Sequence, residues 1–335
     1  MVNLQTEFIE FHDTIKLSFE DNEELREKRD ILLKKLRANI TDDAPPYDYF
    51  NQGSYAMHTG VKPEEGDYDI DVGLRFDLER SDYPDPVTVK KWVYDALDGH
   101  TKRVEIRRSC VTVTYQNDGE AEYHVDFACY ADENDDLYIA KGKKNSSAQN
   151  RRWEQSDPVG LIDKMKTRFS DKDDRAQFRR IIRYMKKWKN KHFDVDGNGA
   201  PTGIALTTLA YEYFTPSYQV NQATGKRAYD DFRALKNLAE EVERAFNYQY
   251  DIDTQTYHHV IHQELFVSPY NDLFEKMTLN QQDEFYDQIC TLIKKLGEAE
   301  KKTKKSEACT IMTEILGNEF PIKTERSYVG HSESA

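Results

Sequence analysis

The chain has 335 residues, of which 32% are charged and 38% hydrophobic, as is typical of a folded globular protein with a sizeable core. No apolar run approaches the roughly 20 residues that a membrane-spanning helix needs. Residues 1–10 lack the basic region and apolar stretch of a secretory signal. We therefore expect a cytoplasmic protein with no membrane partner.

Cysteine usage and net charge argue against a cysteine-based structural framework and against a nucleic-acid substrate. The four cysteines are scattered and form no CxxC pair, which disfavours a structural zinc site and a disulfide framework. The formal net charge of −14 argues against a long nucleic acid as substrate, because such binding usually needs a basic surface. Small phosphorylated substrates held with metal ions fit this balance better.

The first half of the chain is predicted to begin with a helix and continue with strands. Apolar residues recur at helical spacing through residues 1–40, and the proline-containing segment 42–48 ends that pattern. Strands are predicted for residues 69–76, 103–115 and 122–130, with a hairpin turn at 117–119. The polar, basic segment 141–152 is predicted to be a mobile loop.

The second half is predicted to be helical. Residues 175–191 carry an apolar stripe, and Thr202 after Pro201 is a suitable N-cap for the next helix. Helical patterns continue at 232–248 and 281–299, and the polar tail from residue 320 to residue 335 is predicted to be loose. The fold class is therefore α+β, with a mixed sheet first and a helical lobe second.

A Gly-Ser pair is the first candidate for chemistry, in the string Gln52-Gly53-Ser54. Glycine lets a backbone approach a phosphate closely, and serine adds a hydroxyl and can cap a following helix, whose N-terminus favours anions. Taken alone, a Gly-Ser pair is usually only a turn. Its meaning depends on what lies beside it.

The second candidate is Asp69-Ile70-Asp71. Side chains alternate along a strand, so Asp69 and Asp71 point to one face and the apolar residues that follow point to the other. Two carboxylates on one face repel each other unless a cation lies between them, and Mg²⁺ prefers such hard oxygen ligands. A solvated acidic strand face is the ordinary alternative.

Asp126 is the third candidate. Tyr123, Val125 and Phe127 share one face of its strand, so Asp126 lies on the other face together with His124. Alone it would be a partly exposed strand aspartate. It gains meaning because its strand can lie beside that of Asp69 and Asp71 and complete a cluster of three carboxylates near the Gly-Ser turn.

These motifs resemble the nucleotidyltransferase superfamily of DNA polymerase beta and poly(A) polymerase. More narrowly, Gln52-Gly53-Ser54-Tyr55-Ala56 followed by Asp67-Tyr68-Asp69-Ile70-Asp71-Val72 is similar to the bacterial cGAS/DncV-like nucleotidyltransferases (CD-NTases). The segment from Ile181 to Trp188 and then Ala200-Pro201-Thr202 resembles the part of 2′-5′-oligoadenylate synthetases that covers the triphosphate. By this resemblance Lys186 contacts phosphate and Thr202 lies near the nucleotide; a solvated lysine and a simple helix cap are the alternatives.

The resemblance implies an enzyme that condenses ribonucleoside triphosphates, ATP among them, into a cyclic di- or trinucleotide in anti-phage (CBASS) signalling. It implies two Mg²⁺ ions, with Mn²⁺ as a substitute, on Asp69, Asp71 and Asp126, and phosphate contacts from Gln52, Gly53 and Ser54. It also implies an E1/E2-like or HORMA-type partner protein. Some members are joined to another protein through their C-terminal residue, which corresponds to Ala335 here.

The same resemblance implies a bilobal architecture. We expect a first helix and nucleotidyltransferase core at residues 1–155, a helical lobe at 156–320 and a flexible tail at 321–335. The DNA-sensing zinc module of the vertebrate relative is not expected, and His258, His259 and His262 are expected on a surface helix. Two alternatives remain: an RNA 3′-end or protein nucleotidyltransferase of this fold, and a catalytically silent nucleotide-binding module.

Overall fold

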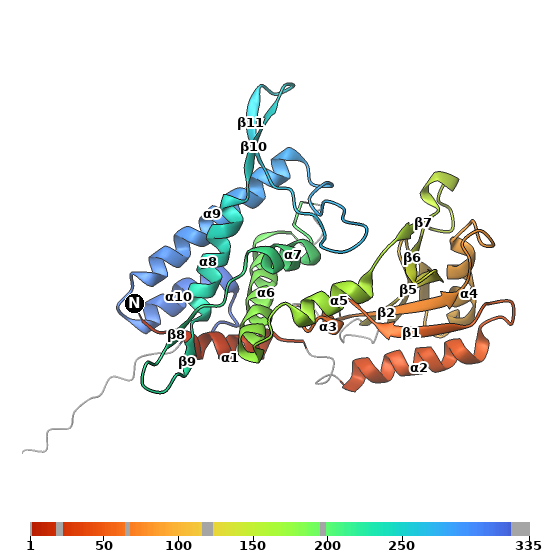
Figure 1. Ribbon diagram of the computed structural model, residues 1–335, viewed down its shortest axis with the longest axis horizontal. Helices are drawn as coiled ribbons and strands as arrows, with labels where there is room; N and C mark the ends of the chain where they lie inside the picture. Colours follow the sequence, from red (N-terminus) through yellow and green to blue (C-terminus); the bar gives the residue numbers. More distant parts are fainter. Residues whose placement is uncertain (1, 18–22, 64–67, 116–122, 195–198, 323–335) are drawn as a thin grey trace, which may run out of the picture. The chain divides into compact units, whose positions relative to one another are not determined.

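The computed structural model describes residues 2–17, 23–63, 68–115, 123–194 and 199–322, which form two compact units (Figure 1). We call them the sheet unit and the helical unit. The sheet unit comprises Lys16–Ser170 and Glu264–Asn271, and the helical unit comprises Met1–Ile15, Asp171–Gln263 and Asp272–Ala335.

These units differ from the expected boundaries. Residues 1–15 belong to the helical unit, the change of unit falls after Ser170 rather than after residue 155, and Glu264–Asn271 returns to the sheet unit. The expectation of one helix through residues 1–40 was wrong, because α1 (Gln5–Ile15) and α2 (Glu23–Asn39) are separate helices in different units.

The sheet unit is built around a mixed sheet with the order β1-β2-β5-β4-β3, extended by β6 on β5 and β7 on β6. Its elements are α2, β1 (Tyr47–Asn51), α3 (Gly53–Ala56), β2 (Tyr68–Asp77), α4 (Val87–Leu97), β3 (Arg103–Ile106), β4 (Val111–Tyr115), β5 (Tyr123–Glu133), β6 (Asp136–Lys141), η1 (Ala148–Asn150), β7 (Arg152–Gln155) and α5 (Pro158–Thr167). The predicted turn at 117–119 lies outside the described residues.

Burial follows the alternation expected from the sequence. On β2, Ile70, Val72, Leu74 and Phe76 are at most 1% exposed, and they join Val125 and Phe127 of β5 in one core cluster. Leu25, Leu32 and Leu36 of α2 and Val89 and Val93 of α4 belong to the same cluster. One face of the sheet is thus sealed by apolar packing, and polar side chains are confined to the other.

The basic segment 141–152 is anchored rather than loose. Lys90 of α4 is fully buried, and its ammonium donates to the carbonyl oxygens of Gly142 and of Arg108, the latter at 2.9 Å. Burial lowers the pKa of Lys90 to about 8. The Arg151 guanidinium lies 2.7 Å from the carboxylate of Asp85, which lies just before α4. Both ends of the segment 141–152 are therefore held by α4 or by the residues just before it.

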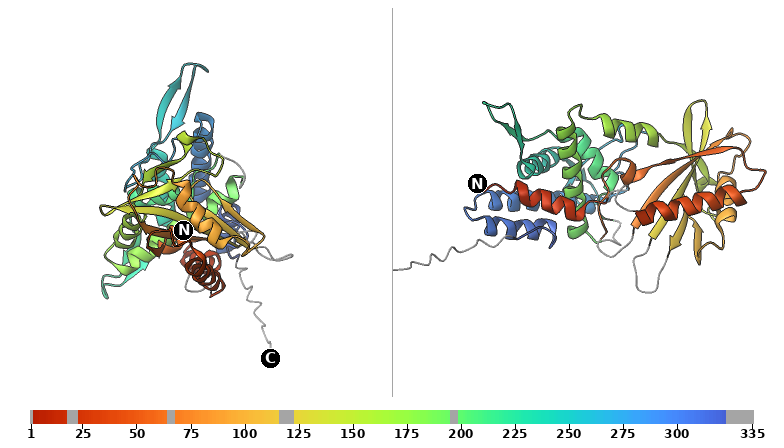
Figure 2. Two further views of the ribbon diagram at one scale, coloured as in Figure 1. Left: turned by 90° about the vertical axis from the view of Figure 1, so that its right-hand side faces the viewer. Right: turned by 90° about the horizontal axis from the view of Figure 1, so that it is seen from below.

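The helical unit contains helices and two small hairpins, both of which project from the helices (Figures 1 and 2). Its elements are α1, α6 (Lys172–His192), α7 (Gly203–Tyr213), β8 (Tyr218–Val220), β9 (Arg227–Tyr229), α8 (Asp231–Arg244), β10 (Asn247–Asp251), β11 (Thr256–Val260), α9 (Leu279–Glu300) and α10 (Lys305–Leu316). No helix within the described residues is long and apolar enough to span a membrane.

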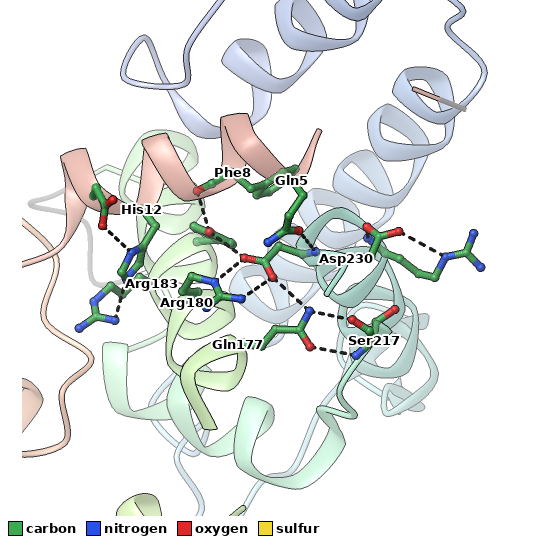
Figure 3. Close-up of polar contacts among 12 residues, drawn as sticks. Gln5, Phe8, His12, Gln177, Arg180, Arg183, Ser217 and Asp230 are labelled. Atoms are coloured by element: carbon green, nitrogen blue, oxygen red, sulfur yellow. Dashed lines mark hydrogen bonds and ion pairs between the residues drawn. The ribbon is translucent and has the colours of Figure 1, made fainter. Parts of the chain in front are cut away.

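Helix α6 is the central element of this unit. Its predicted apolar stripe is buried, as Phe178, Ile181, Ile182, Met185 and Trp188 are at most 1% exposed. Its polar residues take part in a buried hydrogen-bond network around Asp231 of α8. Nε and Nη2 of Arg180 donate to the two carboxylate oxygens of Asp231 at 2.6 and 2.8 Å. Gln177 adds hydrogen bonds to Ser217 in both directions (Figure 3). Such a satisfied network holds α6 in one position.

Three local expectations in this unit were wrong. The helix predicted to continue to residue 248 ends at Arg244, and Asn247 begins β10. His258 and His259 lie on β11 and contact Asp283, so they are not on a surface helix. Phe320 is 1% exposed and packs against Phe8 with ring centroids 5.2 Å apart, so the loose segment does not begin there.

Candidate active site

The three candidate aspartates lie on two adjacent strands of the sheet unit. Strands β2 and β5 run parallel, and their register pairs Asp71 with Asp126 and Asp69 with His124. Paired residues in neighbouring strands share a face, so all three carboxylates lie on the face opposite the apolar core. The backbones of neighbouring strands lie about 4.8 Å apart, so residues that are far apart in the sequence come close together here.

The Gly-Ser turn lies against the same carboxylates. Gly53 has φ +69°, and a Cβ at this position would lie 1.9 Å from Oδ2 of Asp71. The backbone N–H of Gln52 donates to the carbonyl oxygen of Asp71 at 3.1 Å. Only glycine allows both this backbone conformation and this close approach, so the turn and the strand form one site.

Ser54 does not act as the helix cap that the sequence suggested. The N-cap of α3 is Gln52, which makes no side-chain cap hydrogen bond, and Ser54 is the second residue within the helix. The carbonyl oxygen of Ser54 accepts from the backbone N–H of Thr59 at 2.8 Å. A left-handed glycine can itself begin the turn, so no serine cap is needed.

Asp126 has a partner that the sequence reasoning did not identify. Thr112 of β4 is paired with Asp126 in register, and its buried hydroxyl donates to Oδ1 of Asp126 at 2.5 Å. This hydrogen bond fixes the direction of the carboxylate. The sequence shows threonines alternating with valines on this strand, but the register of β4 on β5 was needed to recognise that Thr112 is the one opposite Asp126.

Burial, together with the charges of the aspartates, raises the pKa values of two groups beside the carboxylates. Burial raises the pKa of Tyr55 far above its usual value, and the charges of Asp69 and Asp71 raise it further. Burial and the charge of Asp126 raise the pKa of the Cys110 thiol to about 12. Both groups therefore stay protonated at neutral pH, and the negative charge of this face rests on the carboxylates.

The carboxylates share a face and a register without closing around a single point. Across the described segments, no three His, Cys, Asp or Glu side chains are gathered closely enough to hold a metal ion as they stand. The oxygen-only donor set is the kind that Mg²⁺ prefers, and the missing side chain of Gly53 leaves the Asp71 carboxylate accessible from the turn.

Lys186 and Thr202 meet in the helical unit. Thr202 is the N-cap of α7, as predicted, and its hydroxyl accepts from the backbone N–H of Ala205 at 3.2 Å. A Cβ at Gly203 would lie 3.6 Å from Cε of Lys186, so the lysine side chain runs beside the start of α7. A cation beside free backbone N–H groups is a suitable contact for an anion.

Comparison with known families identifies the class of the domain that carries these carboxylates and the Gly-Ser turn. Residues 47–130, which include both aspartate strands, match the family model described as the nucleotidyltransferase domain of cyclic GMP-AMP synthase DncV-like proteins. This segment is therefore a DncV-like nucleotidyltransferase domain, and the resemblance drawn from its motifs is confirmed.

Relatives extend the similarity along the chain. The chain is 29% identical over 175 residues to the cyclic GMP-AMP synthase of Escherichia albertii, with 49% of this chain and 37% of that protein covered. It spans 37% of the length of that relative and 51% of the length of a second, the c-di-GMP synthase of Roseivirga ehrenbergii.

Two solved structures share the fold. The Vibrio cholerae DncV cyclic AMP-GMP synthase, a prokaryotic cGAS homologue, matches with a TM-score of 0.66 at 16% identity, covering 95% of this chain and 97% of that one. CdnC of E. coli MS115-1, solved in complex with HORMA-deltaN, matches with a TM-score of 0.67 at 16% identity, covering 94% and 98%. The predicted mixed α/β fold class is thus confirmed over nearly the whole chain.

Proposed function

We propose that this chain condenses ribonucleoside triphosphates into a cyclic di- or trinucleotide, releasing pyrophosphate, as a signal in anti-phage defence. The observation that carries the proposal is the register of Asp71 with Asp126 beside Gly53, where a Cβ would lie 1.9 Å from the Asp71 carboxylate. The DncV-like domain supports the reaction class. The relatives are named as a cyclic GMP-AMP synthase, a c-di-GMP synthase and a cyclic AMP-GMP synthase, which favours a cyclic product made from purine nucleotides.

Asp69, Asp71 and Asp126 would hold the divalent ions, two Mg²⁺ in our proposal, with Mn²⁺ as a substitute. Bound ions of this kind neutralise triphosphate charge and lower the pKa of an attacking hydroxyl. The register that places Asp71 beside Asp126 on one face of the sheet supports this assignment, because like charges that lie close together favour a bound cation.

The remaining residues would bind and orient the triphosphate. Gly53 and Ser54 would contact its phosphates through the turn, with Gln52 beside them. Lys186 and Thr202 are proposed as nucleotide-binding residues on the ground of the family resemblance alone. A ribose hydroxyl attacks the α-phosphorus, a new P–O bond forms, and the bond to the leaving pyrophosphate breaks. Cyclisation repeats this reaction within the linear intermediate. Positioning supplies much of the rate in such reactions.

Product analysis tests the proposal. We expect the purified chain, incubated with the four ribonucleoside triphosphates and Mg²⁺ or Mn²⁺, to release pyrophosphate and form a small product resistant to alkaline phosphatase. Mass spectrometry then identifies its bases and size. Extended RNA or a nucleotidylated protein would instead support the two transferase alternatives, and metal-dependent triphosphate binding without pyrophosphate release would support a silent binding module.

A change at Thr112 tests the role assigned to Asp126. Thr112→Val keeps the side-chain shape but removes the hydroxyl that donates to Asp126. Because a hydrogen bond to a charged group contributes about 1.5–3 kcal/mol, we expect kcat to fall about 10- to 100-fold. Initial rates of pyrophosphate release measure this effect.

Thr114→Val is the matched control for that change. Thr114 lies on the same strand and face and is also buried, but its hydroxyl has no hydrogen-bond partner in the part of the chain that the structure describes. We expect Thr114→Val to keep both the rate and the melting temperature. Equal rates for the two variants would contradict the role of Thr112.

Partner and location follow only from the family and are proposed on that basis. The solved complex of CdnC with HORMA-deltaN makes a HORMA-type protein a reasonable partner to test, and an E1/E2-like pair acting on Ala335 is the second. We propose a cytoplasmic location, where triphosphates are abundant.

A further inference from the structure

One buried hydroxyl contacts the residue that precedes the Gly-Ser turn. Tyr130 of β5 donates from its hydroxyl to Oε1 of Gln52 at 2.9 Å, and its side chain is 2% exposed. Gln52 is also tied to the aspartate strand through its backbone N–H, which donates to Asp71. The side chain and the backbone of Gln52 are thus each held by a different strand of the sheet.

Packing holds Tyr130 in one orientation. Tyr130 follows Asp126 and Ala128 along the same face of β5, where it packs in a small cluster of buried residues. The Phe50 ring lies beside it with centroids 5.8 Å apart. Phe50 fits there because its neighbour Gly73 has no side chain, since a Cβ at Gly73 would lie 2.3 Å from the ring. A ring confined in this way cannot withdraw its hydroxyl from Gln52.

The hydroxyl of Tyr130 remains a donor at neutral pH. Burial raises the pKa of Tyr130 far above its usual value, so the proton stays on the oxygen. The oxygen of the Gln52 amide is therefore engaged from inside the protein. The amide nitrogen Nε2 has no acceptor among the described residues, and the Gln52 side chain is only half-buried.

We infer that Tyr130 is a positioning residue that turns the Gln52 amide so that its two N–H donors face the phosphates of the bound triphosphate. An amide that is free to rotate would present its oxygen for part of the time and repel the same phosphates. With the oxygen held by Tyr130, the donors stand beside the N–H groups of the Gly-Ser turn without a reorganisation cost. This inference rests on the proposed function.

A double-mutant cycle tests the inference. Tyr130→Phe removes only the hydroxyl, and we expect KM for the triphosphate to rise about tenfold with a smaller change in kcat. Gln52→Ala should raise KM to a similar extent. In the Gln52→Ala background, Tyr130→Phe should have no further effect, because a residue that acts only through Gln52 loses its influence with it.

Tyr138→Phe serves as the matched control. Tyr138 lies on the neighbouring strand β6, packs against the main core, and its hydroxyl has no hydrogen-bond partner within the described residues. We expect its KM to equal that of the wild type. Melting temperatures of all variants show whether the fold is retained, and the Kd for ATP with Ca²⁺, measured by calorimetry, gives a second cycle that does not depend on turnover.

The outcomes separate the two proposals. Additive effects of Tyr130→Phe and Gln52→Ala, or an unchanged KM in Tyr130→Phe, would overturn the positioning role while wild-type turnover still supports the proposed function. A wild-type chain that neither binds ATP nor releases pyrophosphate would overturn both. If the chain binds ATP without turnover, the calorimetric cycle alone decides the role of Tyr130.

Discussion

Replacing Asp69 and Asp71 together with alanine should abolish nucleotide turnover and leave the fold intact. Loss of one preorganised electrostatic contact at a reacting centre costs about 10²–10³ in kcat, so we expect a loss of at least about 10³-fold for both. The fold should survive, because these carboxylates lie on the face opposite the apolar core and their removal relieves like-charge repulsion. Pyrophosphate release and melting temperature measure the two effects.

Two further measurements make this test specific. Asp77→Ala removes an exposed carboxylate from the end of the same strand and should leave turnover unchanged. Binding of Mn²⁺, followed by electron paramagnetic resonance, should weaken in the double variant and not in Asp77→Ala. Wild-type turnover in the Asp69→Ala, Asp71→Ala chain would show that the carboxylates are not the catalytic ones.

Replacing Gly53 with alanine should disable the same site through the backbone. A left-handed conformation costs a residue with a side chain about 1–2 kcal/mol. The added Cβ would also meet the Asp71 carboxylate at 1.9 Å, so the turn or the carboxylate has to move. Because a displacement of about 1 Å in an active site can cost about 10²-fold, we expect turnover to fall by about that factor.

Gly99→Ala separates the clash from the strain. Gly99 also lies in the sheet unit and has φ +70°, but a Cβ there would meet nothing within 4 Å. Both variants should lower the melting temperature slightly, whereas only Gly53→Ala should lose turnover. If the two variants have the same activity, the contact between the turn and Asp71 has no functional importance.

Local periodicity was sufficient to predict which residues share a face. The alternation along residues 69–76 separated Asp69 and Asp71 from Ile70 and Val72, and the structure buries the apolar set as predicted. The cap at Thr202 and the stripe on α6 were predicted for the same reason. Each of these features depends on neighbours within one strand or one helical turn, so the sequence alone contains the necessary information.

The wrong predictions have the same cause, because helical spacing is read from a short stretch of sequence and carries no information on distant segments. The heavily charged first forty residues contain two helical patterns in succession, and helical spacing alone cannot reveal that they belong to different units. Residues 247–260 are rich in tyrosine and histidine, which suit a strand as well as a helix, and pairing of β10 with β11 decides between them.

The sequence by itself determined the residue types of the site, the faces on which they lie and the family they resemble. Only the tertiary structure decided that Asp71 is paired with Asp126, that Thr112 holds Asp126 and that Tyr130 holds Gln52. The physical reason is that strand register and side-chain hydrogen bonds arise between segments far apart in the chain. Many registers preserve the same alternation, and packing of the whole sheet selects one of them.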